Sequence, residues 1–395
     1  MPGQLSLQTG LQHPLHQLRQ KPALPGQLDP TLIDPVHQLV QETLIKKPID
    51  RLLRRPLRAV RPRHTVHPEP RFLRSVYTEN LIPPKKQSLE ANVDTDLDTL
   101  ATALYVVTDD LLASHPERVP PRPAVGIAPR ISDAELCTLA ALLALLGFTS
   151  EHRWLRYAHR HLTPLFPDLP QQPGYNKRLR RLADTMAWLV SRLGAATSIG
   201  DDTVWVVDST PVECGRSRET ARRSELAGWA EYGYCASHTR YFWGLRLHLV
   251  ATLHGLPVGW ALTGAKADER HALTDILTHT PGLAGRTGQT VIGDKNYYGK
   301  LFEAELADAG ITLLRPTRAH ENARPGEPFF KPLRQIIESV NDTLKGQLDL
   351  EQHGGRTIAG VCTRVAQRIL ALTAAIWHND SLGLTIRRSL IAYDH

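Results

Sequence analysis

The sequence of 395 residues predicts a mixed α/β fold, in which helices pack on a mixed sheet, preceded by a helical domain. Two observations support this prediction. From residue 204 onward, short apolar runs and helical patterns follow in the order strand, hairpin, helix, strand, helix, strand, helix. Between residues 131 and 193, by contrast, the long patterns are helical.

The strands are predicted from short runs rich in β-branched or alternating apolar residues. The first run ends at Asp208 and is followed by Ser-Thr-Pro, so we expect Asp208 at the C-terminal edge of a buried strand. The next two runs flank His254 and Gly255 and predict a hairpin. The predicted strands are Val204 to Val207, Trp243 to Leu253, Leu256 to Leu262, Thr290 to Ile292, and Ile311 to Leu314.

Three helices are predicted between and after these strands. Asp268 is a plausible N-cap for a helix that runs to about Thr278. Lys300 to Ala309 forms the next helix, which Gly310 stops. The last helix is amphipathic and is expected to end before Gly354. Its apolar residues are Leu333, Ile336, Ile337, Val340, Leu344 and Leu348.

The helical region before residue 200 carries clear start and stop signals. Ser132 and Glu135 open an apolar helix that Gly147 stops. A second helix is expected from about Ser150, and a third from about Asn176, where four basic residues precede the apolar ones. A helical module with a basic helix start suits the reading of DNA repeats, and an ordinary helical domain with surface charge is an equal alternative.

Three carboxylates stand in three different local settings: Asp208 after a strand, Asp294 after the second strand and Gly293, and Glu338 on the last helix. Hard oxygen ligands on rigid elements are what two divalent ions need for displacement at a phosphate. An Asp after a strand is usually a turn or cap residue. The combination therefore predicts a two-metal phosphodiester-cleaving site, although no single member does.

The last helix adds a polar face beside its apolar stripe. At 3.6 residues per turn, Arg334, Glu338, Asn341 and Lys345 fall on this face. Such a face is most often a solvated surface with ion pairs. A carboxylate between two basic residues also suits a metal ligand next to a DNA phosphate.

From Val204 to Asn379 the chain resembles the DDE transposases of bacterial insertion sequences. The resemblance is sharpest at DSTP (208 to 211), at GDKNYYG (293 to 299), and at Arg334, Glu338 and Lys345 with three and six residues between them. Many of these enzymes carry a Tyr three residues before the Arg, where this chain has Lys331. The departure affects an aromatic contact near the transposon end, which Tyr297 or Tyr298 is a candidate to replace.

The resemblance implies a ribonuclease-H-like catalytic domain in which Asp208, Asp294 and Glu338 bind two Mg²⁺ (or Mn²⁺) ions. Transposon-end DNA and target DNA are the implied partners. DNA contacts are assigned by the resemblance to Arg334, Lys345, Lys295 and Tyr298. The enzyme would act as a homodimer or larger assembly in the cytoplasm, associated with the nucleoid. A ribonuclease-H-like nuclease without strand transfer, and an inactive DNA-binding derivative, are the alternatives.

Composition divides the chain into a leader (1–92), a helical, DNA-binding domain (93–200) and a catalytic domain (201–395). The leader holds 13 of the 29 prolines and 14 Lys or Arg against 7 Asp or Glu, so the remaining residues are balanced in charge. Such a composition predicts disorder or local helix only. The leader is either a nucleic-acid-binding arm or the product of a mis-assigned start, with Val93 as the alternative first residue.

The other features are less specific. Residues 211 to 242 mix arginines with glutamates, so a solvated insertion and a DNA contact are equally supported, and their tyrosines suit either core packing or base stacking. Four cysteines without a CxxC pair do not predict a zinc ribbon or a disulfide framework. No run of 18 apolar residues occurs, so no membrane span is expected.

Overall fold

The computed structural model describes residues 84–122, 128–235, 239–322, 324, 327–384, 386 and 390, with side chains from residue 97 onward except those of 327–329. All of these residues fall within one compact unit, Arg63–His395. The predicted leader lies outside the described residues up to residue 83. Its last residues open helix α3 (Pro84–Ser114), which runs through Val93.

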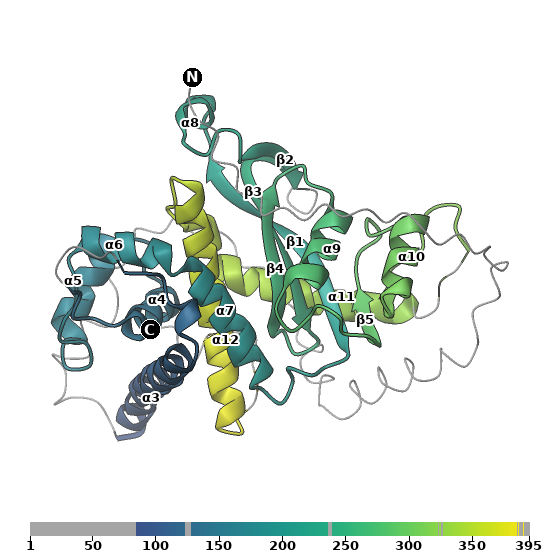
Figure 1. Cartoon of the computed structure of the whole chain (residues 1–395). Helices are drawn as coiled ribbons and strands as arrows, with labels where there is room; N and C mark the ends of the chain where they lie inside the picture. Colours follow the sequence, from purple (N-terminus) through teal and green to yellow (C-terminus); the bar gives the residue numbers. More distant parts are fainter. Residues whose placement is uncertain are drawn as a thin grey trace. The chain divides into compact units, whose positions relative to one another are not determined.

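A mixed sheet organises the part of the chain after residue 200 (Figure 1). β1 lies between β3, which is antiparallel to it, and β5, which is parallel to it. β6 is parallel to β5, and β4 and β2 pair with β3 in antiparallel fashion. The strands are β1 (Val204–Gly215), β2 (Glu231–Cys235), β3 (Arg240–Thr252), β4 (Pro257–Gly264), β5 (Gln289–Ile292) and β6 (Ile311–Leu314).

The order β4, β3, β1, β5, β6 is the ribonuclease-H-like arrangement that the resemblance implies, so the predicted fold class is confirmed. The predicted hairpin is also confirmed. The backbone N–H of Thr252 donates to the carbonyl of Leu256 at 2.9 Å, and Gly255 takes φ of 87°, which glycine adopts without a steric penalty.

Helices α9 (Glu269–His279) and α10 (Lys300–Asp308) cover one face of the sheet, and Figure 1 shows α9 against the strands. Strand residues Trp205, Val207 and Val250 form a buried core with apolar residues of both helices. Because side chains alternate along a strand, Val206 and Asp208 point to the opposite face. There α11 (Glu327–Asp342) packs against β1.

The last amphipathic helix is shorter than its apolar pattern predicts. α11 ends at Asp342 and continues as a π-helical turn, Thr343–Gln347, and a 3₁₀ turn, Leu350–Gln352. The Thr343 hydroxyl donates to the carbonyl of Ser339 at 3.0 Å, a back-bond that competes with regular helix geometry. Leu344 and Leu348 are nevertheless buried, so the pattern predicted burial correctly but not helix length.

The helices before the sheet start largely where the sequence predicts. α4 (Asp133–Leu145) begins with a reciprocal capping box between Ser132 and Glu135, and α5 (Glu151–His161) has Ser150 as its N-cap. The third predicted helix is wrong in extent, because it is two helices, α6 (Gln172–Arg181) and α7 (Ala183–Ala195), that meet at Leu182. The predicted boundary of this domain at residue 200 remains a prediction.

The C-terminal helix α12 (Ile358–Ser381) packs against α4 and α7. Gln367 donates its side-chain N–H to the carbonyl of Ala140 at 2.7 Å, which ties together segments 227 residues apart. By length and composition α12 is the one helix among the described residues apolar enough to cross a membrane, and 72% of its apolar window is buried inside the protein. Such burial is typical of a core helix.

The segment between β1 and β3 contains a short helix, α8 (Arg218–Arg223), none of whose residues is buried. The aromatic residues around it differ in burial: Phe242 and Trp243 are in the core, whereas Tyr232, Tyr234 and Tyr241 are exposed. Core packing is therefore confirmed for the first two only.

Candidate active site

Asp208 lies in the interior of β1, where it pairs with Leu249 of β3. The expectation that the strand ends at Asp208 is wrong, since pairing with β3 continues to Gly215. Pro211 is compatible with the longer strand because β5 pairs with β1 only as far as Val206, which leaves that edge of β1 without a strand partner among the described residues. Asp208 thus sits where β1 emerges beyond β5.

Asp294 follows the end of β5 and is aligned with Asp208. The parallel register pairs Val206 with Ile292, and two further residues along each chain place Asp208 beside Asp294. Gly293 is required at this turn, since a Cβ there would lie 2.7 Å from the ring of Tyr297. The carboxylate accepts the backbone N–H of Asn296 at 2.7 Å, which orients it.

The electrostatics agree with this proximity. The pKa of Asp208 is raised to about 6, mainly by burial and also by the charges of Asp294 and Glu269, against the lowering effects of the Ser209 backbone N–H and of Arg334. Tyr297, only 1% exposed, has its pKa raised well above its usual value by burial and then by the same three carboxylates. Negative charge is therefore concentrated where β1 continues past the end of β5.

Glu338 comes to this region from α11 but is held differently. Its carboxylate pairs with Arg334 at 3.5 Å, and its side chain is 51% exposed. One helical turn later, Asn341 donates its side-chain N–H to Asp208 Oδ2 at 3.2 Å. Since residues three apart lie on one side of a helix, Glu338 is on the side of α11 that meets Asp208.

Among the described residues, no three His, Cys, Asp or Glu side chains are gathered into a group that could hold a metal ion. In this arrangement Glu338 is paired with Arg334. The donors nevertheless fit a divalent ion. Two neighbouring carboxylates repel one another until a cation lies between them. In addition, the side-chain amide oxygen of Asn341, a residue that is 4% exposed, is buried without a hydrogen-bond partner in the described structure.

Sequence reasoning missed a second cluster behind the strand. Ser209 donates its hydroxyl to Glu269 at 2.6 Å, and Arg246 bonds to both, at 3.0 Å to Ser209 and 3.2 Å to Glu269. Glu269 directly follows the predicted cap Asp268, whose capping role is confirmed. The alternation of Arg246 and His248 with leucines was the only signal that polar groups of β3 face a neighbouring element.

The residues assigned to DNA by resemblance have different surroundings. Lys295 is exposed and Lys345 is half-buried, and neither has an ion pair among the described residues. Tyr298 is 38% exposed, and its ring lies under the guanidinium of Arg318, 3.4 Å from the ring centre. Tyr297 is buried, so it is wrong as a candidate for the missing aromatic contact.

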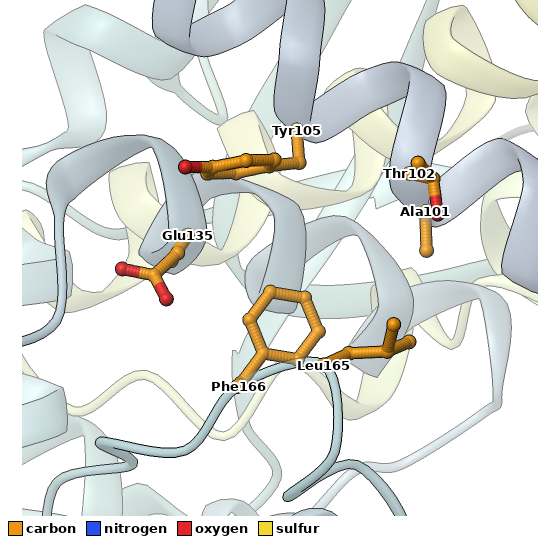
Figure 2. Close-up of a pocket in the computed structure, with 6 residues that line it drawn as sticks. All are labelled: Ala101, Thr102, Tyr105, Glu135, Leu165 and Phe166. Atoms are coloured by element: carbon orange, nitrogen blue, oxygen red, sulfur yellow. The ribbon is translucent and has the colours of Figure 1, made fainter.

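A small cavity of about 180 Å³ lies elsewhere, in the helical region, between Tyr105, Glu135 and Phe166. Figure 2 shows the hydroxyl end of Tyr105 directed toward the side on which Glu135 lies. Glu135 is already used in the cap of α4. None of the predicted site residues lines this cavity.

Comparison with known proteins bears on the sheet domain directly. Residues 200–358 match the family model described as the transposase DDE domain. Residues 200–358 are thus similar to the DDE domain of transposases. The matched residues of this DDE domain include Asp208, Asp294 and Glu338, and the family generally uses divalent metal ions.

Other comparisons add little to the DDE domain match. No curated protein matches the chain. Among solved structures, the chain is similar to the cryo-EM structure of the piggyBac transposase synaptic complex with hairpin DNA, at 8% identity and a TM-score of 0.39, over 75% of this chain and 76% of that one.

Proposed function

We propose that this chain is a DNA transposase that cuts at the ends of an insertion sequence and joins the freed 3′-hydroxyl to target DNA. The observation that supports the proposal best is the alignment of Asp208 with Asp294 inside the matched DDE domain. The carboxylates of Asp208, Asp294 and Glu338 would hold two Mg²⁺ or Mn²⁺ ions. When bound, such ions activate the attacking hydroxyl and stabilise the leaving oxygen.

The residues around the carboxylates have positioning roles in this proposal. Asn341 orients Asp208 through its 3.2 Å hydrogen bond, and the Asn296 N–H orients Asp294. Arg334 exchanges its partner: when a DNA phosphate arrives, the guanidinium binds it and releases Glu338 to join the other two acids. DNA binding thereby completes the site.

Lys345, Lys295 and Tyr298 complete the proposed DNA contacts. The two lysines carry no ion pair in the described structure, so their charge is free for backbone phosphates. The ring of Tyr298 lies under Arg318, which would bind phosphate beside the exposed ring edge. Two DNA ends must be cut together, so we propose a homodimer or larger assembly, acting in the cytoplasm on the nucleoid.

The deciding experiment is an incubation of the chain with a labelled duplex that carries the flanking inverted repeats, in Mg²⁺ or Mn²⁺. We expect nicks at the ends and joined products from wild type and from Asp308→Ala, an exposed control on α10, and neither from Asp294→Ala. Nicks without joined product would instead identify a nuclease. Specific binding without any cleavage would identify an inactive DNA-binding derivative.

A further inference from the structure

A second polar cavity, of about 490 Å³, lies between the start of α12 and helices α5 and α6. Arg180, Arg356 and Arg364 line it, together with amide and hydroxyl side chains that include Gln172 and Asn176. It contains none of the predicted site residues, and the DDE mechanism makes no use of it. The cavity is therefore separate from the candidate active site.

The arginines of this cavity differ in whether a carboxylate already pairs with them. Arg364 is 12% exposed and forms an ion pair with Glu151, which is 7% exposed and also accepts from Asn176 at 2.9 Å. Arg180 and Arg356 are exposed and have no carboxylate partner in the part of the chain that is described. Two guanidinium groups thus face the cavity with their charge uncompensated.

His353 fixes this cavity to the catalytic strand. Its ring is buried, with Nε2 3.0 Å from the carbonyl oxygen of Glu213, while Nδ1 accepts the backbone N–H of Gly355 in the cavity wall. Glu213 is five residues after Asp208 on β1. At a rise of about 3.3 Å per residue, Glu213 is roughly 17 Å from Asp208 along the strand, so His353 meets β1 at that distance.

The two unpaired arginines matter because the rest of this part of the chain has no excess of positive charge. Residues 93–395 contain equal numbers of basic and acidic side chains, 33 of each, so this part of the chain has no net positive charge to attract DNA. Phosphate binding there requires local clusters in which arginines are not already paired. Arg180 and Arg356, on separate elements but in one cavity, form such a cluster.

We propose that this cavity binds backbone phosphates of the duplex whose end occupies the DDE site, through Arg180 and Arg356. This inference rests on the proposed function. For a duplex that runs along β1, in which successive phosphates of one strand rise by about 3.4 Å, roughly 17 Å corresponds to about five base pairs from the cleaved phosphate. The cavity positions the DNA and reads no base sequence.

The test is DNA binding by fluorescence anisotropy, without metal, over a series of salt concentrations. We expect the double variant Arg180→Gln/Arg356→Gln to bind roughly ten-fold more weakly than wild type, with the slope of log K against log salt reduced by about 2. The loss is the same for end DNA and unrelated duplex. Ethylation interference at phosphates about five base pairs from the cut then disappears in the variant.

The matched control is Arg156→Gln/Arg160→Gln, which removes two exposed arginines from α5 outside the cavity. Equal weakening by both double variants, or no weakening by the cavity variant, overturns the proposal. If wild type binds DNA and the cavity variant binds it more weakly, but neither protein cuts, the proposed function is wrong and the proposed phosphate site is supported. If wild type binds no DNA, both proposals are wrong.

Discussion

The two strand-borne carboxylates and the helix-borne one are held in contrasting ways. Asp208 and Asp294 are placed by the register of β1 and β5, and backbone or amide N–H groups fix their orientation. Glu338 is on α11, half exposed and bound to Arg334. Sheet pairing therefore positions two of the proposed ligands before any substrate binds, whereas the position of the third proposed ligand depends on its ion pair with Arg334.

The largest effect is expected at the helix-borne acid. Glu338→Gln keeps the size of the side chain but removes its charge, so we expect at least a roughly thousand-fold loss of metal-dependent cleavage, measured as the nicking rate of end DNA. Glu305→Gln, an exposed position on α10, is the control. Retained activity in Glu338→Gln would show that another residue provides the third ligand, and Glu269 is the next carboxylate to test.

A smaller loss is expected one turn along the same helix. Asn341→Ala removes the N–H that orients Asp208 and the buried oxygen beside it, so we expect Mn²⁺ affinity to fall by roughly 10- to 100-fold in calorimetric titration. Gln335→Ala, an exposed change on α11, should leave the affinity unchanged. An unaltered Mn²⁺ affinity in Asn341→Ala would show that Asn341 of α11 does not contribute to metal binding.

The strand-borne acids should make the metal-free protein pH-dependent. Because the pKa of Asp208 is about 6 in the folded chain and 3.8 in the reference state, its charge destabilises the folded state fully above pH 6, and this penalty is lost as pH falls toward 3.8. We expect Asp208→Asn to raise the free energy of unfolding by about 1 to 3 kcal/mol at pH 8 and by little near pH 4. Urea unfolding at both pH values, with wild type in parallel, measures the difference. If Asp208→Asn is no more stable than wild type at pH 8, the charge of Asp208 does not destabilise the folded state.

The smallest effect is expected from the exchangeable ion pair itself. Arg334→Gln removes a partly exposed pair, so we expect less than about 1 kcal/mol of lost stability in thermal unfolding. Binding of end DNA should weaken uniformly across sequences and with a shallower salt dependence. A large loss of stability with unchanged DNA binding would show that Arg334 is structural and that Glu338 is not exchangeable.

The sequence predicts best where local chemistry decides structure. Ser132 and Ser150 cap the helices predicted from them, and the β-branched run before Asp294 is a strand. It predicts less well where pairing partners decide: the length of β1 depends on β3, which lies about 40 residues away, so Ser-Thr-Pro after Asp208 looked like a strand end.

The site was predicted in part for a similar reason. The carboxylates stand out in their motifs, but whether they meet depends on register and on competing partners such as Arg334. The contacts of Asn341 and of Glu269 join residues 133 and 60 positions apart, and no periodicity encodes such pairs. The cavity between α12, α5 and α6 likewise has no local signature.

Helix α12 has a consequence for synthesis of the chain. It is synthesised after the other described helices and strands, yet it supplies the partner surface of α4 and α7, which emerge some 160 residues or more earlier. Because domains fold during translation only when their core residues have emerged, those early helices wait for α12. A product terminated before α12 would leave their apolar faces open to proteases, so only chains that include α12 would accumulate.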